Sequence, residues 1–283
     1  MFSTCWSFLP HRRWPVKEIP QELPRSVCLR VTRRCNVACA FCQAPPTSRS
    51  ELSVREIGEI SRFFASGGAR SVKLAGGEPT VREDLPEIIA AVAGAGLRPV
   101  VTTNGFAVST RAMDACAEYA GEFKFSIHRP SIENDDVLRR KSFGDIERNL
   151  AEVVRREIGL SINSVVAPGG LNLMEEMAAF ACERGARKIS FIPVVSRGRA
   201  NGKREFSFRS GELTEVLHHV RELAQMYRGR MDVRCIDIRS RDYWIVENDG
   251  SLWIERATED ADVRICGKEA LMSTCSTRPA EAG

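Results

Sequence analysis

The chain has 283 residues, of which 43% are hydrophobic and 28% charged, a composition that suits a globular protein with a sizeable core. Its basic and acidic residues are interspersed and leave a net charge of +4, without the polybasic run that favours nucleic acid or membrane surfaces. No apolar run reaches the roughly 18 residues that span a bilayer, and the apolar N-terminal residues precede the basic ones, the reverse of a secretory signal. We therefore predict a cytoplasmic protein with no membrane contact, for which nucleic acid is an unfavoured partner.

Residues 1–25 contain four prolines and no clear periodicity, which predicts an irregular arm. From residue 26 onward, short β-rich runs alternate with amphipathic stretches, which predicts alternating strands and helices. Capping-box sequences precede the first two helices, at Ser53 to Glu56 and at Thr80 to Glu83. The predicted strands are 27–32, 71–75, 98–103, 122–127, 160–166 and 188–194, and the later helices are 109–120, 143–156, 172–185 and 211–228.

Six such β–α units in series predict an α/β fold with a parallel sheet, because parallel strands need crossover helices. Such a sheet curls into a partial (β/α)6 TIM-like barrel, with ligands at the C-terminal ends of its strands. From residue 231 the pattern changes, and a strand (231–238) and hairpin arms around Asn248-Asp249-Gly250 predict a small C-terminal β-containing domain. The predicted domains are the arm at 1–25, a core at 26–230, the small domain at 231–275 and a disordered tail at 276–283.

Cys35, Cys39 and Cys42 directly follow the first predicted strand. In a chain of this length, ten cysteines favour metal or redox chemistry over a disulfide framework. Thiolates are the preferred ligands of iron–sulfur clusters, and three of them on a four-iron cube leave one iron open for catalysis. A closed zinc site, the alternative, would need a fourth cysteine or histidine nearby, and the next histidine is His128.

This C-x3-C-x2-C spacing, with the aromatic Phe41 before its last cysteine, resembles the signature of the radical S-adenosylmethionine (SAM) superfamily. The resemblance covers about residues 26–200. Three further segments at predicted strand ends are similar to family motifs: Gly76-Gly77-Glu78-Pro79, Thr103-Asn104-Gly105 and residues 191–200. The first resembles the segment that binds the SAM amino group, the second commonly follows the third strand, and the last resembles the segment that passes the adenine.

The resemblance implies a [4Fe–4S] cluster held by the three cysteines, with SAM chelated to its open iron. One-electron cleavage of SAM then yields a 5′-deoxyadenosyl radical that abstracts a hydrogen atom from the substrate, and a donor such as flavodoxin or ferredoxin supplies the electron. Gly76 and Gly77 let the backbone approach the ligand without a Cβ, and Glu78 is expected to pair with the SAM ammonium. A plain turn before a helix, with Pro79 near its start, is the structural alternative.

Further strand-end residues match positions where the family places SAM or substrate contacts. Ser126 and Asn163 match contacts to the ribose or a carboxylate. His128 is expected at the barrel mouth, with a loop cap as the alternative. Arg197 is expected beside a carboxylate of SAM or substrate, with a solvated loop as the alternative. The apolar residues of 191–200 serve adenine packing or the core equally well.

Cys235, Cys266 and Cys275 lie in the predicted small domain. Relatives with a SPASM or twitch domain bind auxiliary clusters there, and Cys235 followed by 14 residues and then Gly250 resembles that frame, except that Glu255 replaces a cysteine. Three interpretations stay open: the three cysteines ligate a second [4Fe–4S] cluster, one of them (assigned to Cys235) donates a hydrogen atom to a substrate radical, or all are ordinary thiols. The cysteines expected in the core are Cys28, Cys116 and Cys182.

We predict a radical SAM enzyme, an oxidoreductase or an isomerase, that acts on a small polar metabolite such as a sugar, aminocyclitol or nucleoside in antibiotic-type biosynthesis. Dehydrogenation, epimerisation and elimination all fit. Maturation of a ribosomal peptide is a second hypothesis, disfavoured because 25 proline-rich residues are too few for the N-terminal peptide-recognition domain common among such relatives. A third hypothesis is a non-catalytic metal-binding or redox-sensing protein. A fourth is an RNA-modifying enzyme, which the missing basic patch disfavours.

Overall fold

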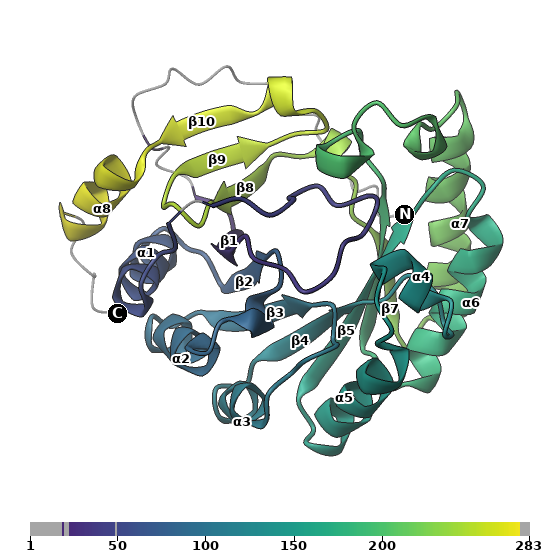
Figure 1. Cartoon of the computed structure of the whole chain (residues 1–283), viewed down its shortest axis with the longest axis horizontal. Helices are drawn as coiled ribbons and strands as arrows, with labels where there is room; N and C mark the ends of the chain where they lie inside the picture. Colours follow the sequence, from purple (N-terminus) through teal and green to yellow (C-terminus); the bar gives the residue numbers. More distant parts are fainter. Residues whose placement is uncertain (1–18, 20–22, 49, 278–283) are drawn as a thin grey trace, which may run out of the picture.

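A ten-stranded sheet forms the centre of the molecule in this computed structural model, which describes residue 19 and residues 23–48 and 50–277 (Figure 1). The spatial order of the strands is β10-β9-β8-β1-β2-β3-β4-β5-β6-β7, and β1 to β7 are parallel. The strands are β1 (Ser26–Thr32), β2 (Ser71–Gly76), β3 (Arg98–Thr103), β4 (Glu122–Ser126), β5 (Gly159–Val166), β6 (Lys188–Pro193), β7 (Asp232–Cys235), β8 (Tyr243–Val246), β9 (Leu252–Glu255) and β10 (Val263–Cys266).

Helices cover the outer face of this curved sheet (Figure 1). A helix lies between each pair of successive parallel strands, which confirms the predicted α/β alternation and the partial TIM-like barrel. No helix within the described ranges is long and apolar enough to cross a membrane. The helices are α1 (Val54–Ser66), α2 (Leu85–Gly94), α3 (Thr110–Glu118), α4 (Asn134–Leu138), α5 (Phe143–Arg155), α6 (Leu171–Glu183), α7 (Glu212–Met226) and α8 (Lys268–Thr277).

The two faces of the barrel strands differ in polarity. Leu74 on β2, and Phe123 and Phe125 on β4, are buried in the main hydrophobic core under the helices. Successive side chains of a strand point to opposite faces, so the positions between them face the barrel interior. On β2 and β4 those positions carry Lys73 and Lys124. The core therefore lies between sheet and helices, and the barrel interior is lined by polar groups.

Only one of the two predicted capping boxes is formed. Ser53 caps α1, accepting from the Glu56 amide while the Glu56 carboxylate accepts from the Ser53 amide. The prediction for Thr80 to Glu83 is wrong. The Thr80 hydroxyl and amide both donate to Glu78, and α2 begins later, after Asp84, without a side-chain cap. The Thr80 hydroxyl does not cap the helix because it donates to the buried carboxylate of Glu78.

The C-terminal strands join the barrel sheet at both of its edges. β7 pairs in parallel with β6 at one edge, and β8 pairs in parallel with β1 at the other. The hairpin predicted around Asn248-Asp249-Gly250 is confirmed as the antiparallel pair β8 and β9, to which β10 adds. The strands of residues 231–275, which the sequence analysis assigned to a small C-terminal domain, therefore share one sheet with the core.

Three elements, α4, β10 and α8, were not predicted, and of these α4 and β10 have too few residues for a clear hydrophobic period. Most of the predicted irregular arm at 1–25 lies outside the described residues. Of the tail predicted at 276–283, the first two residues end α8, and the rest also lies outside the described residues.

Candidate active site

The three clustered cysteines lie in the loop that follows β1, at the C-terminal end of the parallel strands, and each thiol is half-buried. The loop turns through a hydrogen bond from the Cys42 amide to the Cys39 carbonyl (3.3 Å). The segment after β6 supports it, because the Arg199 amide donates to the Cys42 carbonyl (2.9 Å). Gly198 has a φ of +54°, and a Cβ there would lie 2.3 Å from the Cys42 carbonyl oxygen. Only glycine permits this contact.

The three thiols act on one another electrostatically. Burial, together with the neighbouring Cys42 and Cys35, raises the pKa of Cys39 to about 12, and burial also raises the pKa of Cys35. Three deprotonated sulfurs at this spacing repel one another, so the set suits a cationic metal centre. Among the described residues, no three Cys, His, Asp or Glu side chains are placed around a single metal ion. A multi-iron cluster binds its thiolates at separate irons, and this loop fits that use.

The Gly-Gly-Glu-Pro segment packs against the chain that leads into the cysteine loop. The Gly77 amide donates to the Thr32 carbonyl and the Glu78 amide to the Arg34 carbonyl, both at 2.8 Å. Gly76 has a φ of +151°, and a Cβ there would lie 2.0 Å from the Thr32 carbonyl oxygen. The glycines therefore permit a close approach, as predicted, but the partner seen here is the protein's own backbone.

Glu78 is a buried acceptor that ties the second strand end to the third. Its carboxylate accepts from the Thr103 hydroxyl (2.7 Å), the Asn104 amide (2.6 Å) and the Thr80 amide (3.1 Å). Burial raises the pKa of Glu78, and these donors oppose the rise. The Asn104 side chain in turn donates to Asn36 in the cysteine loop (2.7 Å). Pairing of Glu78 with the SAM ammonium stays a prediction, and in this structure the carboxylate is engaged by the protein's own donors.

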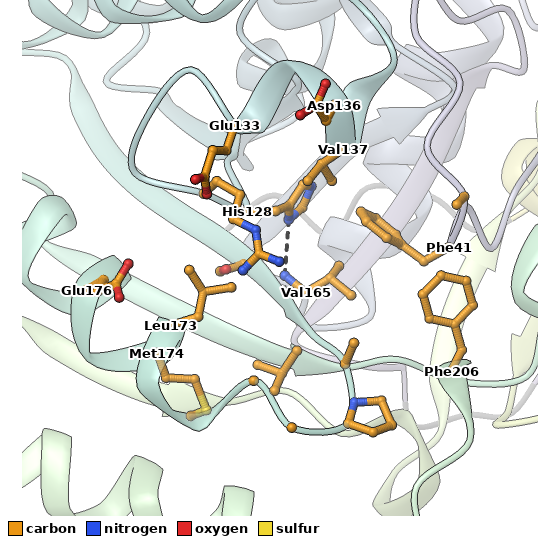
Figure 2. Close-up of a pocket in the computed structure, with 18 of the residues that line it drawn as sticks. Phe41, His128, Glu133, Asp136, Val137, Val165, Leu173, Met174, Glu176 and Phe206 are labelled. Carbon is orange, nitrogen blue, oxygen red and sulfur yellow. Dashed lines mark hydrogen bonds between the residues drawn. The ribbon is translucent and has the colours of Figure 1, made fainter. Parts of the chain in front are cut away.

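A cavity of about 670 Å³ lies beside the cysteine loop, at the ends of β4 and β5 (Figure 2). The Phe41 and His128 rings meet edge to face on its wall, with centroids 4.8 Å apart. Phe206 contacts Phe41 from the other side, at 6.4 Å. Figure 2 also shows carboxylates around the cavity. These are Glu133, Asp136 and Glu176.

His128 is held in one tautomer. The Val165 amide donates to its Nδ1 (3.1 Å, dashed in Figure 2), so the ring proton lies on Nε2. Burial, with a contribution from Arg129, lowers the pKa of His128 to about 3, and the ring is therefore neutral at physiological pH. The Nε2–H has no acceptor among the residues described, which leaves it available to a ligand.

Ser126 and Asn163 lie side by side, because their Cα atoms are register partners on β4 and β5. Both are half-buried and face the barrel interior. The Oδ1 atom of Asn163 is buried and has no hydrogen-bond partner among the described residues. An unpaired buried carbonyl oxygen is costly unless a ligand or water completes it. It therefore offers an acceptor to a hydroxyl or ammonium group.

The model of the Radical SAM superfamily matches residues 29–181, more than half of the chain, and the match contains the cysteine loop and the Gly-Gly-Glu-Pro segment. The chain belongs to the radical SAM superfamily. It is accordingly an enzyme whose cofactors are a [4Fe–4S] cluster and SAM, and the non-catalytic hypothesis is excluded.

Several curated relatives of this radical SAM enzyme are named as cyclases. The probable GTP 3′,8-cyclase of Sulfurisphaera tokodaii is 27% identical over 75% of this chain and 67% of its own length. The PqqA peptide cyclase of Rhizobium meliloti is 29% identical over 81% of this chain and 62% of its own. The chain thus spans about two thirds of the length of these relatives.

Solved structures share the fold at low sequence identity. SuiB of Streptococcus suis bound to the precursor peptide SuiA has a TM-score of 0.70 at 14% identity, covering 82% of this chain and 59% of that one. A structure of anSMEcpe with bound AdoMet and the Cp18Cys peptide has a TM-score of 0.66 at 14% identity, covering 90% and 80%. These likenesses support the radical SAM fold.

Arg197 is placed away from the cavity of this radical SAM enzyme. It is buried and donates to both oxygens of Asp262 (2.7 and 2.8 Å) and to the Arg256 carbonyl (2.9 Å). A further contact reaches Glu255 at 3.3 Å. Residues of the C-terminal hairpin region therefore bind the Arg197 guanidinium, which the sequence analysis expected beside a carboxylate of SAM or substrate.

The segment 191–200 does not line the cavity, which is bounded instead by the end of β5 and the loop after it (residues 164–170) and by α4. Val194 is buried, with its amide bonded to Val166, as a core residue would be. Sequence reasoning missed the β5 loop. Its signal was Pro168-Gly169-Gly170, which follows a strand at the same rim as the cysteines.

The structure does not gather the three C-terminal cysteines. Cys275 on α8 lies close enough to Cys266 that burial, Glu59 and Cys266 together raise its pKa to about 12. Cys235 ends β7, at the opposite edge of the sheet from β10. It is the register partner of Phe191 and packs with it on the helix-covered face. This arrangement supports neither a ligand set of all three cysteines nor Cys235 as a hydrogen-atom donor inside the barrel.

The three cysteines expected in the core behave largely as predicted. Cys28 and Cys116 are buried, whereas Cys182 is only half-buried and accepts a hydrogen bond from Arg230 at 3.2 Å.

Proposed function

We propose that this radical SAM enzyme abstracts a hydrogen atom from a residue of a peptide substrate. The observation that carries the chemistry is the three-cysteine loop beside a cavity walled by Phe41 and His128. The peptide is supported by the relatives, among which are a PqqA peptide cyclase and a SuiB structure bound to a precursor peptide. This reverses the order of preference that the sequence suggested.

Each part of the site has a distinct task. Cys35, Cys39 and Cys42 would hold three irons of the cluster. When bound, the cluster supplies the electron that splits SAM into methionine and a 5′-deoxyadenosyl radical, which takes the substrate hydrogen. The unpaired Asn163 Oδ1 would accept a hydrogen bond from SAM, and the His128 Nε2–H would donate to the ligand in the cavity. Exclusion of water from this region protects a reactive radical.

The cluster assignment is tested by replacing Cys39 with alanine. After anaerobic reconstitution, the native protein is expected to hold about four irons per chain and to form 5′-deoxyadenosine from SAM with reduced flavodoxin. C39A is expected to lose both, because one of three ligands is gone. Cys182→Ala, which removes a half-buried cysteine elsewhere, is the matched control. Zinc in the native protein, or turnover by C39A, would refute the assignment.

The peptide assignment is tested by adding extract of the source organism, separated into peptide-sized and smaller fractions, to the reconstituted enzyme and SAM. Stimulated formation of 5′-deoxyadenosine is expected with the peptide-sized fraction, and protease treatment of that fraction is expected to abolish it. Stimulation confined to the small, protease-resistant fraction would instead establish a metabolite substrate.

A small polar metabolite (a sugar, aminocyclitol or nucleoside) is the second candidate, with dehydrogenation or epimerisation as its outcome. The observation in its favour is the polar interior of the barrel, where Lys73, Lys124 and Arg234 occupy inward-facing positions. A compact polar substrate fits such a lining better than an apolar one does.

A further inference from the structure

Three cations occupy inward-facing positions on the barrel strands β2, β4 and β7, which are separated from one another by other strands of the sheet. Lys73 on β2 and Lys124 on β4 alternate with core residues that pack under the helices. Arg234 on β7 is the register partner of Ser190 on β6, and its Nε donates to that hydroxyl (3.2 Å). Ser190 is in turn the partner of Asn163, whose neighbour is Ser126.

The same register places two of these cations, Lys124 and Arg234, next to the predicted SAM contacts, whereas Lys73 is level with Glu122, two residues before Lys124 on β4. Ser126 lies two residues after Lys124 on β4, a step of about 6–7 Å along a strand. Arg234 stands level with Asn163 through Ser190. A molecule seated below Ser126 and Asn163, deeper in the barrel, would therefore meet Lys124 and Arg234.

None of these three cations forms an ion pair with a carboxylate of the described residues. Lys124 is only 4% exposed, yet it forms no hydrogen bond or ion pair with any residue of the described ranges. The Lys73 ammonium lies 4.9 Å from the centre of the Tyr243 ring, a cation–π contact that leaves its charge uncompensated. The acid that attracts Lys124 is Glu122, and its carboxylate is already engaged by Ser161 and by Arg98 at 3.3 Å.

We propose that Lys73, Lys124 and Arg234 bind an oxyanion of the substrate, a carboxylate or a phosphate, and so orient the substrate beneath SAM. The inference rests on the proposed function and deepens it, because it specifies an acidic substrate. Buried charges are ordinarily paired, and an anionic ligand supplies the missing partner. Ammonium and guanidinium groups are the donors that proteins use for carboxylate and phosphate.

Electrostatics in the barrel agree with this geometry. Burial lowers the pKa of Lys124 to about 8, with Lys73, Arg234 and Lys188 adding to the effect and Glu122 opposing it. Burial also lowers the pKa of Lys73, with Arg234, Arg241 and Lys188 adding. The cations therefore lie close enough to repel one another, and a bound oxyanion would relieve that repulsion.

The test measures oxyanion binding to the reconstituted holoenzyme. Thermal unfolding is followed with sodium phosphate, sodium succinate or sodium chloride at matched ionic strength, and the concentration dependence of the midpoint gives the affinity. We expect phosphate or succinate to stabilise the native enzyme above chloride. Lys124→Met and, separately, Lys73→Met are expected to weaken that binding about tenfold or more, since each removes a charge-assisted hydrogen bond. The control, Lys141→Met, removes an exposed lysine between α4 and α5 and is expected to bind as the native enzyme does.

The pattern of results decides the proposal. Stabilisation by phosphate alone indicates a phosphorylated substrate, and stabilisation by succinate alone a carboxylate such as an acidic side chain; both support the site. The proposal is overturned if neither oxyanion stabilises the native enzyme more than chloride does. It is also overturned if K124M and K73M bind the oxyanion as tightly as the native enzyme. Formation of 5′-deoxyadenosine without substrate is measured in the same samples. Its absence would count against the proposed function itself, whereas its presence without oxyanion binding would count only against this site.

Discussion

Two groups of buried charge line the barrel, and they are built in opposite ways. At the β1, β8 and β9 side, Arg30 donates to Glu255 (2.5 and 2.9 Å) and to Glu247, so the cation faces carboxylates. At the β2 to β7 side, Lys73 and Lys124 form no ion pair with any described residue, and Glu122, the acid that attracts Lys124, is engaged by Ser161 and Arg98. We call these the paired group and the unpaired group. Charges that the fold itself requires are compensated by the fold, whereas uncompensated ones point to a ligand.

The paired group also explains the departure from the auxiliary-cluster frame. Glu255, which stands where that frame has a cysteine, lies between Arg30 and Arg197. Burial opposes the charge of Arg30, but Glu255 and Glu247 together raise its pKa. In this enzyme an ion-pair network therefore attaches the hairpin to the barrel at the position where relatives are expected to have a cluster ligand.

The largest effect is expected from breaking the paired group. Arg30→Met leaves Glu247 and Glu255 buried without their partner, which is expected to lower the free energy of unfolding by about 3–5 kcal/mol. Urea-induced unfolding measures it. Arg55→Met, at a side chain that is 81% exposed, is expected to change stability by less than about 0.5 kcal/mol. A mild effect of R30M would show that the paired group does not hold the hairpin.

A smaller effect is expected from removing Glu122, the acid that attracts Lys124. Glu122→Gln abolishes the attraction to Lys124 and the contact with Arg98, and is expected to destabilise the protein by about 1–3 kcal/mol. The same change is expected to tighten phosphate binding in the thermal assay, since it removes a competing anion. Weaker phosphate binding by E122Q would show that the carboxylate supports the cations instead of competing for them.

The opposite sign is expected when a cation of the unpaired group is removed. Lys124→Met replaces a buried charge that forms no ion pair among the described residues by an apolar side chain of similar length, and is expected to raise the free energy of unfolding by about 1 kcal/mol without ligand. The measurement is again urea-induced unfolding. Destabilisation by K124M would mean that the ammonium has a structural partner and that the two groups are alike.

The smallest effect is expected in the pH dependence of the stability difference between K124M and the native protein. The pKa of Lys124 is about 8 in the folded protein and 10.5 ordinarily, so between these values the unfolded chain binds more protons. The native protein therefore gains stability as pH rises from about 8 to about 10.5, and the advantage of K124M shrinks over that range. The groups acting on Lys124 are Glu122, Lys73, Arg234 and Lys188. Melting temperatures of both proteins across this range check it, and a constant difference would rule it out.

The fold was predictable because its signals are local and repeated. Strands such as 98–103 and the capping box at Ser53 are read from a few adjacent residues, and the structure reproduces them. The cysteine loop and the two glycines were found for the same reason. The roles of Arg197 and Glu78 were not predictable, because each depends on partners brought from distant strands: Asp262 lies 65 residues after Arg197, and Asn104 lies 26 after Glu78.

The inward cations were also hidden in the sequence. Lys73 and Lys124 look like ordinary exposed residues of alternating strands, and only closure of the barrel turns that polar face inward. Likewise, the sequence suggested Cys235 as a possible ligand of a second cluster. Its pairing with Phe191 in the sheet places it on the helix-covered face, which the sequence alone does not reveal.

The contact between Gly198 and the Cys42 carbonyl has a consequence for how the enzyme is made. In the same region the Arg199 guanidinium donates a hydrogen bond to the Cys39 carbonyl. Arg199 is synthesised 160 residues later than Cys39. Chains fold as they emerge, from the N-terminus onward. The cysteines therefore leave the ribosome long before the segment that shapes their loop, and insertion of iron and sulfide should follow, not precede, closure of the sixth crossover. Cluster delivery to this enzyme is thus expected to be a late, post-folding event.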